Sequence, residues 1–149
     1  MIGDTAAVGI GAVVGALCRH EIGKIAHRKI AQDPKRWSYL NWHTACINIC
    51  GSHILGFLAG IPIATPVRDS SPNSLKSDRF IQSISPRTRL LAAVGFCGSF
   101  TTFSTYSVEV LGFLSKGETL RAISYIAANN IGGIGAAYAG FNVAKRIIG

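Results

Sequence analysis

Charged side chains are scarce in this 149-residue chain. Only 15% of the residues are Asp, Glu, Lys or Arg, and the 7 acidic residues are outnumbered by 15 basic ones. A typical soluble domain carries roughly 25% charged residues, so the composition argues against a soluble class. With 48% hydrophobic residues, 17 glycines and a mean hydropathy of +0.33, the chain is typical of a membrane protein.

The sequence also lacks the residue groupings of enzymes and of nucleic-acid-binding proteins. Its 4 histidines and 4 cysteines form no grouping with the spacing of a catalytic or metal site, so we expect no enzymatic activity. The net charge of +8 would suit nucleic acid in a soluble protein. However, the basic residues lie between apolar runs, and no zinc or RNA-binding signature accompanies them. We expect anionic membrane lipid, and no nucleic acid, as the partner of this charge.

All four cysteines fall inside apolar stretches, where buried thiols are expected rather than a disulfide or a metal site. They are Cys18, Cys46, Cys50 and Cys97. The cysteines therefore do not indicate a redox compartment.

What the chain does contain is four apolar stretches, each close to the roughly 20 residues that cross a bilayer core. They cover residues 5–26, 39–61, 90–114 and 122–143. Arg19 interrupts the first stretch, and we expect it to reach a polar interior or an interface. The segment 62–86 is rich in proline and serine, which predicts a flexible loop. The chain is thus predicted to be an all-α membrane protein, a single domain over 1–149 with four transmembrane helices.

Lys and Arg are divided almost evenly between the two sides that this topology creates, with 8 on one side and 7 on the other. An excess of positive charge on the cytoplasmic side normally sets the orientation. The even division therefore predicts insertion in both orientations and an antiparallel homodimer. The spacings Gly11-x-x-x-Gly15 and Gly56-x-x-x-Gly60 indicate close helix packing, but they do not show which helices pair.

The second stretch has a polar face, because Asn41, Thr44, Asn48 and Ser52 follow spacings of 3 and 4 residues. For any single Asn or Ser, an interhelical hydrogen-bond network is the simpler interpretation. The whole face, next to a polar break in another helix, favours an ion pathway instead.

The third stretch is the most unusual, because hydroxyl and aromatic side chains crowd the segment from Gly95 to Glu109. Its glycines weaken a helix, and the Ser and Thr side chains compete for backbone hydrogen bonds, so we expect a broken third helix. Unwound carbonyls at membrane depth are tolerated where protein or an ion covers them. Phe103 and Tyr106 would project to a similar side, and their ring edges carry partial positive charge that can face an anion.

Two further features remain open at this point. Glu109 is the most membrane-embedded acid, and it suits a vestibule residue, a proton carrier, or an interfacial acid paired with a base. In the fourth stretch, Tyr125 and Asn129 share a helix face and add further hydrogen-bond donors.

Together these motifs closely resemble those of the Fluc/CrcB fluoride channels. The resemblance covers all four stretches, and its third motif is long and highly specific. It is carried by Gly11-x-x-x-Gly15-Ala-x-x-Arg19, by Asn48-x-x-Gly51-Ser-x-x-x-Gly56, by Gly95-Phe-x-Gly98-x-x-Thr101-Thr-Phe-Ser-Thr-Tyr-Ser-x-Glu109, and by Tyr125.

The resemblance implies a dual-topology antiparallel homodimer in the plasma membrane, with two fluoride pores. It also implies a central structural sodium ion held by the backbone carbonyls of Gly98 and Thr101. Arg19 and Glu109 match positions toward the pore mouths. The implied pore residues are Asn48, Phe103, Ser104, Thr105, Tyr106, Tyr125 and Asn129.

The chain departs from the family pattern in three places. Tyr106 replaces the usual second phenylalanine, which adds a hydroxyl group beside the ring edge. Asn129 lies where relatives tend to carry a small hydroxyl residue, and the loop 62–86 is longer than in compact bacterial members. None of these departures removes an implied sodium ligand.

The expected function is passive, fluoride-selective export that lowers the toxicity of cytoplasmic fluoride. Fluoride is small and tightly hydrated, so a selective pore must replace its water with many compact donors along a narrow path. No Lys or Arg, which would hold the anion too tightly, is near Phe103 in the sequence. An alternative is a small dual-topology proton-coupled multidrug exporter, for which only Glu21 and Glu109 offer the required embedded carboxylate. A non-transporting assembly subunit would leave the polar third stretch without a purpose.

Overall fold

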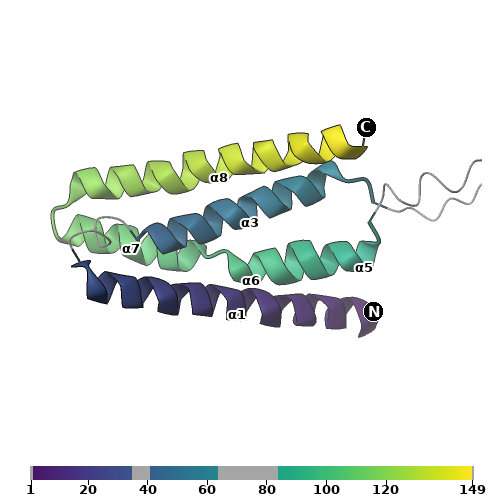
Figure 1. The fold of residues 1–149 in the computed structure, drawn as a ribbon, viewed down its shortest axis with the longest axis horizontal. Coiled ribbons are helices and arrows are strands. Elements are labelled where there is room, and N and C mark those ends of the chain that lie inside the picture. The colour runs from purple at the N-terminus through teal and green to yellow at the C-terminus, as the bar shows by residue number, and fades with distance from the viewer. Residues whose placement is uncertain (1, 35–40, 64–83, 149) are drawn as a thin grey trace, which may run out of the picture.

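The computed structural model describes residues 2–34, 41–63 and 84–148. The longer helices of these ranges lie side by side as a bundle (Figure 1). The described N- and C-terminal ends lie at the same end of that bundle. The helices are α1 (Ile2–Gln32), α3 (Trp42–Gly60), α5 (Pro86–Arg89), η1 (Leu90–Cys97), α6 (Gly98–Phe100), α7 (Phe103–Ser115) and α8 (Thr119–Ile148). The described ranges contain no strand, so the predicted all-α class is confirmed.

Helix α1 is the one helix of the described ranges whose length and composition alone suit a membrane crossing. Its bounds extend past both ends of the predicted stretch 5–26. With 31 residues, it is about 46 Å long at 1.5 Å per residue. That length exceeds the roughly 30 Å thickness of a bilayer core.

Helix α1 packs along the segment formed by η1 and α6 (Figure 1). A Cβ atom at Gly11 would overlap the carbonyl oxygen of Leu91. A Cβ atom at Gly15 would overlap the carbonyl oxygen of Phe96. The first glycine motif therefore brings α1 against the third apolar stretch, a pairing that the sequence spacing left open.

Helix α3 packs against α8 along most of its length (Figure 1). Here too glycine allows the backbones to approach closely. A Cβ atom at Gly56 would overlap the carbonyl oxygen of Ala137, and one at Gly140 would overlap that of His53. Of the predicted stretch 39–61, residues 39 and 40 lie outside the described ranges.

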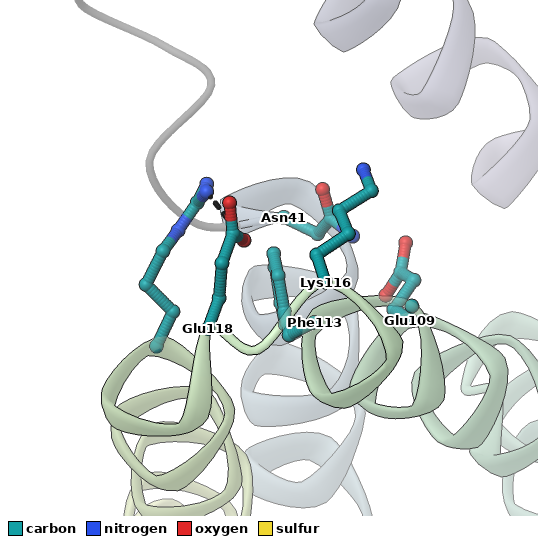
Figure 2. A pocket seen from close by; sticks show the side chains of 7 residues that line it. Asn41, Glu109, Phe113, Lys116 and Glu118 are labelled. Atoms are coloured by element: carbon teal, nitrogen blue, oxygen red, sulfur yellow. Dashed lines mark hydrogen bonds and ion pairs between the residues drawn. The ribbon is translucent and has the colours of Figure 1, made fainter.

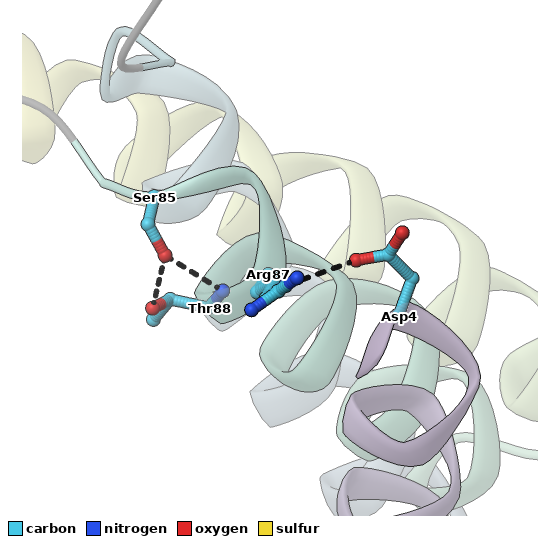
Figure 3. Close-up of polar contacts among 4 residues, drawn as sticks. All are labelled: Asp4, Ser85, Arg87 and Thr88. Atoms are coloured by element: carbon cyan, nitrogen blue, oxygen red, sulfur yellow. Dashed lines mark hydrogen bonds and ion pairs between the residues drawn. The ribbon is translucent and has the colours of Figure 1, made fainter. Parts of the chain in front are cut away.

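Polar contacts tie the start of α1 to the start of α5 (Figure 3). The Arg87 Nε atom donates to Asp4 Oδ1 at 3.3 Å, and both side chains are exposed. Ser85 caps α5, because its Oγ accepts from the Thr88 N–H at 3.1 Å. An exposed ion pair of this kind contributes about 1 kcal/mol or less, so the contact orients the helix ends more than it stabilises them.

The predicted flexible loop 62–86 lies mainly outside the described residues, which omit 64–83. At its two ends, Ile63 and Ile84 form an isolated bridge. The Arg89 Nη1 atom also donates to the carbonyl oxygen of Ile61 at 3.1 Å. The two described ends of the loop therefore lie next to each other at the bundle.

Much of the apolar surface of the single chain is exposed. Few large side chains are fully buried, and the Phe103 ring at the start of α7 is 79% exposed. Large apolar side chains also face outward on α1 and α8, among them Ile10, Val13, Leu17, Leu120, Ile131 and Ile134. Such extensive apolar surface requires lipid or a partner chain to cover it.

The expectation that all four cysteines are buried is wrong for the single chain. Only Cys97 is buried, whereas Cys18, Cys46 and Cys50 are exposed. The reason is that these three lie on outward faces of α1 and α3. No disulfide joins any of the four.

Candidate functional site

The third apolar stretch is interrupted at Thr101 and Thr102. Helix α6 ends at Phe100 and α7 begins at Phe103. Between them the backbone is extended, with ψ at 158° for Thr101 and with φ at −149° and ψ at 106° for Thr102. Backbone groups at such a point leave the regular helical pattern and need other partners.

Asn48, on the neighbouring helix α3, supplies those partners. Its Oδ1 atom accepts from the Thr102 N–H at 2.9 Å, and its Nδ2 atom lies 3.4 Å from the Thr102 carbonyl oxygen. The same Nδ2 atom donates to Asn129 Oδ1 on α8 at 2.9 Å. Asn48 thus connects the interruption to its own helix, α3, and to α8.

The two carbonyls predicted to hold a cation have lost their regular donors. In a continuous α-helix the Gly98 carbonyl would accept from the Thr102 N–H, but that N–H donates to Asn48. The Thr101 carbonyl would accept from the Thr105 N–H, which instead donates to Thr102 Oγ1 at 3.2 Å. Side chains therefore occupy the donors that would otherwise satisfy both carbonyls.

Glu109 lies at the other end of this polar connection. Thr44 Oγ1 donates to its Oε1 atom at 3.1 Å, and Tyr125 Oη donates to its Oε2 atom at 2.5 Å. Tyr125 is fully buried, and its carbonyl oxygen accepts from Asn129 Nδ2 at 3.0 Å. A continuous row of hydrogen bonds therefore runs from Glu109 through Tyr125 and Asn129 to Asn48. We call these four residues the polar row.

Aromatic rings lie next to the polar row. The Tyr106 ring is 5.6 Å, centroid to centroid, from both the Phe103 ring and the Tyr125 ring. The Phe113 ring meets Tyr125 edge-on at 5.7 Å. Ring edges are electropositive, so this arrangement presents uncharged, weakly positive groups beside the hydroxyl and amide donors.

A pocket of about 380 Å³ opens where the polar row ends at Glu109 (Figure 2). Arg121 Nη1 donates to Glu118 Oε2 at 2.7 Å, and the Arg121 guanidinium lies 4.9 Å from the Phe113 ring centroid. The pocket therefore carries charge of both signs, unlike the neutral part of the row. Its lining residues are Asn41, Glu109, Gly112, Phe113, Lys116, Glu118 and Arg121.

Some of the predicted site residues do not join the polar row. Arg19 is half-buried on α1, and Ser104 is exposed on α7. Within the described ranges, no hydrogen bond or ion pair links either side chain to the row. Thr105 is exposed, and its Oγ1 atom accepts from Thr102 Oγ1 at 2.8 Å.

The predicted pore and mouth residues omitted three residues that bond directly to them. Thr102 caps α7. The preference of Thr for helix N-caps is the sequence signal by which it could have been found. Thr44 belonged to the polar face of its helix, at one turn from Asn48. Asn130 donates to Tyr106 Oη at 3.1 Å, but its position one residue beyond Asn129 placed it off the predicted face.

Replacing Asn48 with Leu should leave the Thr102 N–H and the Asn129 Oδ1 atom without the partners that Asn48 supplies. An unsatisfied buried polar group costs about 1–3 kcal/mol, so we expect a lower thermal unfolding temperature for the detergent-solubilised protein. Asn142→Leu is the matched control, because the Asn142 amide donates to the Tyr138 carbonyl of its own helix, at 2.8 Å. Equal losses in the two variants would contradict the role given to Asn48.

An all-helical fold with exposed apolar faces and an internal polar row defines an α-helical membrane protein. The chain belongs to the CrcB-like family, since the family model described as "CrcB-like protein, Camphor Resistance (CrcB)" matches residues 6–141. The family predicted from the sequence motifs is therefore confirmed.

Individual relatives agree with this membership. The chain is 36% identical over 140 residues to a "Fluoride-specific ion channel FluC" of Hyphomonas neptunium, which covers 94% of each chain. It is 31% identical over 147 residues to the protein of that name from Gloeobacter violaceus, covering 99% of this chain and all of the relative. It is also 33% identical to "Fluoride-specific ion channel FluC 2" of a Synechococcus species, over 94% of this chain and 80% of the relative.

Proposed function

We propose that this protein is a fluoride-selective channel that exports fluoride passively and lowers its toxicity in the cytoplasm. The observation that carries the proposal is the polar row with aromatic rings beside it. Apart from Glu109 at its end, the residues of the row carry compact, uncharged amide and hydroxyl groups. Many neutral donors can replace the tightly held water of fluoride without trapping the anion. The names of the relatives support the same ion.

In this proposal the site residues have separate roles along the path. The ring edges of Phe103 and Tyr106 face the dehydrated anion, and Ser104 and Thr105 form a track of hydroxyl groups. Asn48, Tyr125 and Asn129 supply further donors. Glu109 and Arg19 lie toward the mouths. The pocket next to Glu109, with Lys116 and Arg121 in its lining, supports a wider, charged mouth at that end.

We further propose that the chain works as a dual-topology antiparallel homodimer with two pores, crossing the plasma membrane several times. Two observations support this assembly. Lys and Arg are nearly balanced between the two sides. The Phe103 ring, which the pore assignment places against fluoride, is 79% exposed in one protomer and therefore needs a partner to complete its surroundings.

A structural sodium ion at the centre of this dimer is part of the proposal. The carbonyls of Gly98 and Thr101 would hold it, and they fit the role because side chains occupy their regular donors. Within the described ranges no group of three or more His, Cys, Asp or Glu side chains could hold a metal. Hard cations prefer oxygen ligands of the carbonyl type. When bound, the ion supplies positive charge that stabilises unpaired carbonyls in an apolar region.

Anion efflux from liposomes tests the proposed function. Liposomes containing the purified protein, loaded with fluoride or with chloride, should release fluoride down its gradient and retain chloride, with protein-free liposomes as the control. Equal release of both anions would contradict selectivity. Fluoride movement that depends on an opposing proton gradient would instead favour coupled transport of the exporter type.

A further inference from the structure

Tyr106 is held by a residue that the proposed pore does not include. Asn130 of α8 places its Nδ2 atom 3.1 Å from Tyr106 Oη and 2.9 Å from the carbonyl oxygen of Ile126, one turn earlier on α8. Asn130 is exposed on the protomer, and Tyr106 is half-buried. The contact therefore lies at the surface of the single chain, beside the Tyr106 ring.

The Ile126 carbonyl settles which amide atom faces Tyr106. A carbonyl oxygen only accepts hydrogen bonds, so the Asn130 atom beside it must be the amino group and not the amide oxygen. That same amino group is the atom near Tyr106 Oη. The amino group donates one hydrogen to the Ile126 carbonyl oxygen and the other to Tyr106 Oη, so Tyr106 Oη is the acceptor in this contact.

The Tyr106 hydroxyl group consequently keeps its own proton for another partner. In the part of the chain that the structure describes, no acceptor takes that proton. The Tyr106 ring lies 5.6 Å, centroid to centroid, from both the Phe103 ring and the Tyr125 ring. A free O–H group thus lies at a position where the proposed path requires donors to an anion.

We propose that Asn130 is a positioning residue that orients the Tyr106 hydroxyl so that its proton is donated to fluoride. The inference rests on the proposed function, and it extends that function to a specific donor. By holding Oη as an acceptor, Asn130 prevents the hydroxyl from turning toward the amide. Tyr106 then contributes a hydrogen bond that a phenylalanine at this position does not offer.

The test measures fluoride efflux from liposomes over a range of fluoride concentrations, and chloride efflux beside it. Tyr106→Phe removes only the hydroxyl group, and Asn130→Leu removes the amide at similar size. A neutral hydrogen bond is typically worth a factor of several in binding. We expect each variant to raise the half-saturating fluoride concentration about threefold to tenfold, with a lower ratio of fluoride to chloride efflux. The double variant should show no more than the larger single effect.

Two further variants complete the experiment. Asn142→Leu is the control, since Asn142 makes the same kind of bond to a carbonyl one turn earlier on its own helix, at 2.8 Å. Asn130→Asp replaces the donor with an acceptor that would draw the Tyr106 proton away from the anion, and it should weaken fluoride binding like Asn130→Leu. Asn130→Asp therefore still tests the inference if Asn130→Leu does not fold.

The outcomes are distinct. An unchanged half-saturating concentration in Tyr106→Phe would overturn the inference, as would independent, multiplying effects in the double variant. In either case, fluoride efflux by the unaltered protein would leave the proposed function standing. Absence of fluoride efflux from the unaltered protein would overturn both proposals.

Discussion

Phe103→Ile should reduce fluoride efflux from liposomes to the level of protein-free controls while the protein remains folded. Because the ring is 79% exposed on the protomer, its removal costs little packing within the chain. An aliphatic side chain has no electropositive edge to offer a dehydrated anion. We expect the free energy of unfolding to change by only about 0.5 kcal/mol, as for other exposed substitutions.

Phe141→Ile is the matched control for this experiment. Phe141 is a half-buried phenylalanine on α8, with Lys145 Nζ 4.6 Å from its ring centroid, and it is neither part of the polar row nor one of the aromatic residues described beside it. It should retain fluoride efflux. If Phe103→Ile still carries fluoride at the original rate, the pore assignment is wrong.

Gly11→Ala should disrupt the protein far more than Gly9→Ala, although the two glycines lie on the same helix. An added Cβ at Gly11 would overlap the Leu91 carbonyl oxygen and come within 2.9 Å of the Phe96 nitrogen. These are backbone atoms, so α1 and η1 would have to separate, at a cost of about 1–3 kcal/mol or more. We expect a lower thermal unfolding temperature and a smaller yield of monodisperse protein on gel filtration.

Gly9→Ala supplies the comparison, because a Cβ there meets no atom within 4 Å. Alanine is favoured over glycine in helices by roughly 0.5–1 kcal/mol, so this variant should unfold at the same temperature or slightly higher. Similar unfolding temperatures for the two variants would show that α1 does not contact η1 through Gly11.

The sequence predicted the helical class, the family and the segment that carries the polar residues. It did so because these properties depend on local patterns: apolar length, small-residue spacing, and hydroxyl groups near glycine. The polar face through Thr44 and Asn48 was also readable from helical periodicity. In the structure, both side chains make hydrogen bonds toward α7.

The contacts between helices were not readable in this way. The third stretch itself does not encode that the Thr102 N–H donates to Asn48, which belongs to another helix. The contact of Asn130 with Tyr106 likewise depends on the rotation of α8 relative to α7, which no local pattern encodes. The glycine motifs indicated close packing. Only the structure shows that Gly11 packs against η1 and Gly56 against α8.

The bond between Asn48 and Thr102 also bears on how the protein is made. Asn48 precedes Thr102 by 54 residues, so it is synthesised and inserted first. A third stretch that enters the membrane alone would satisfy its own backbone as an uninterrupted helix, because lipid offers no other partner. It would open at Thr101 and Thr102 only on meeting α3. We therefore expect the Gly98 and Thr101 carbonyls to lose their regular donors only once α3 already lies beside the third stretch.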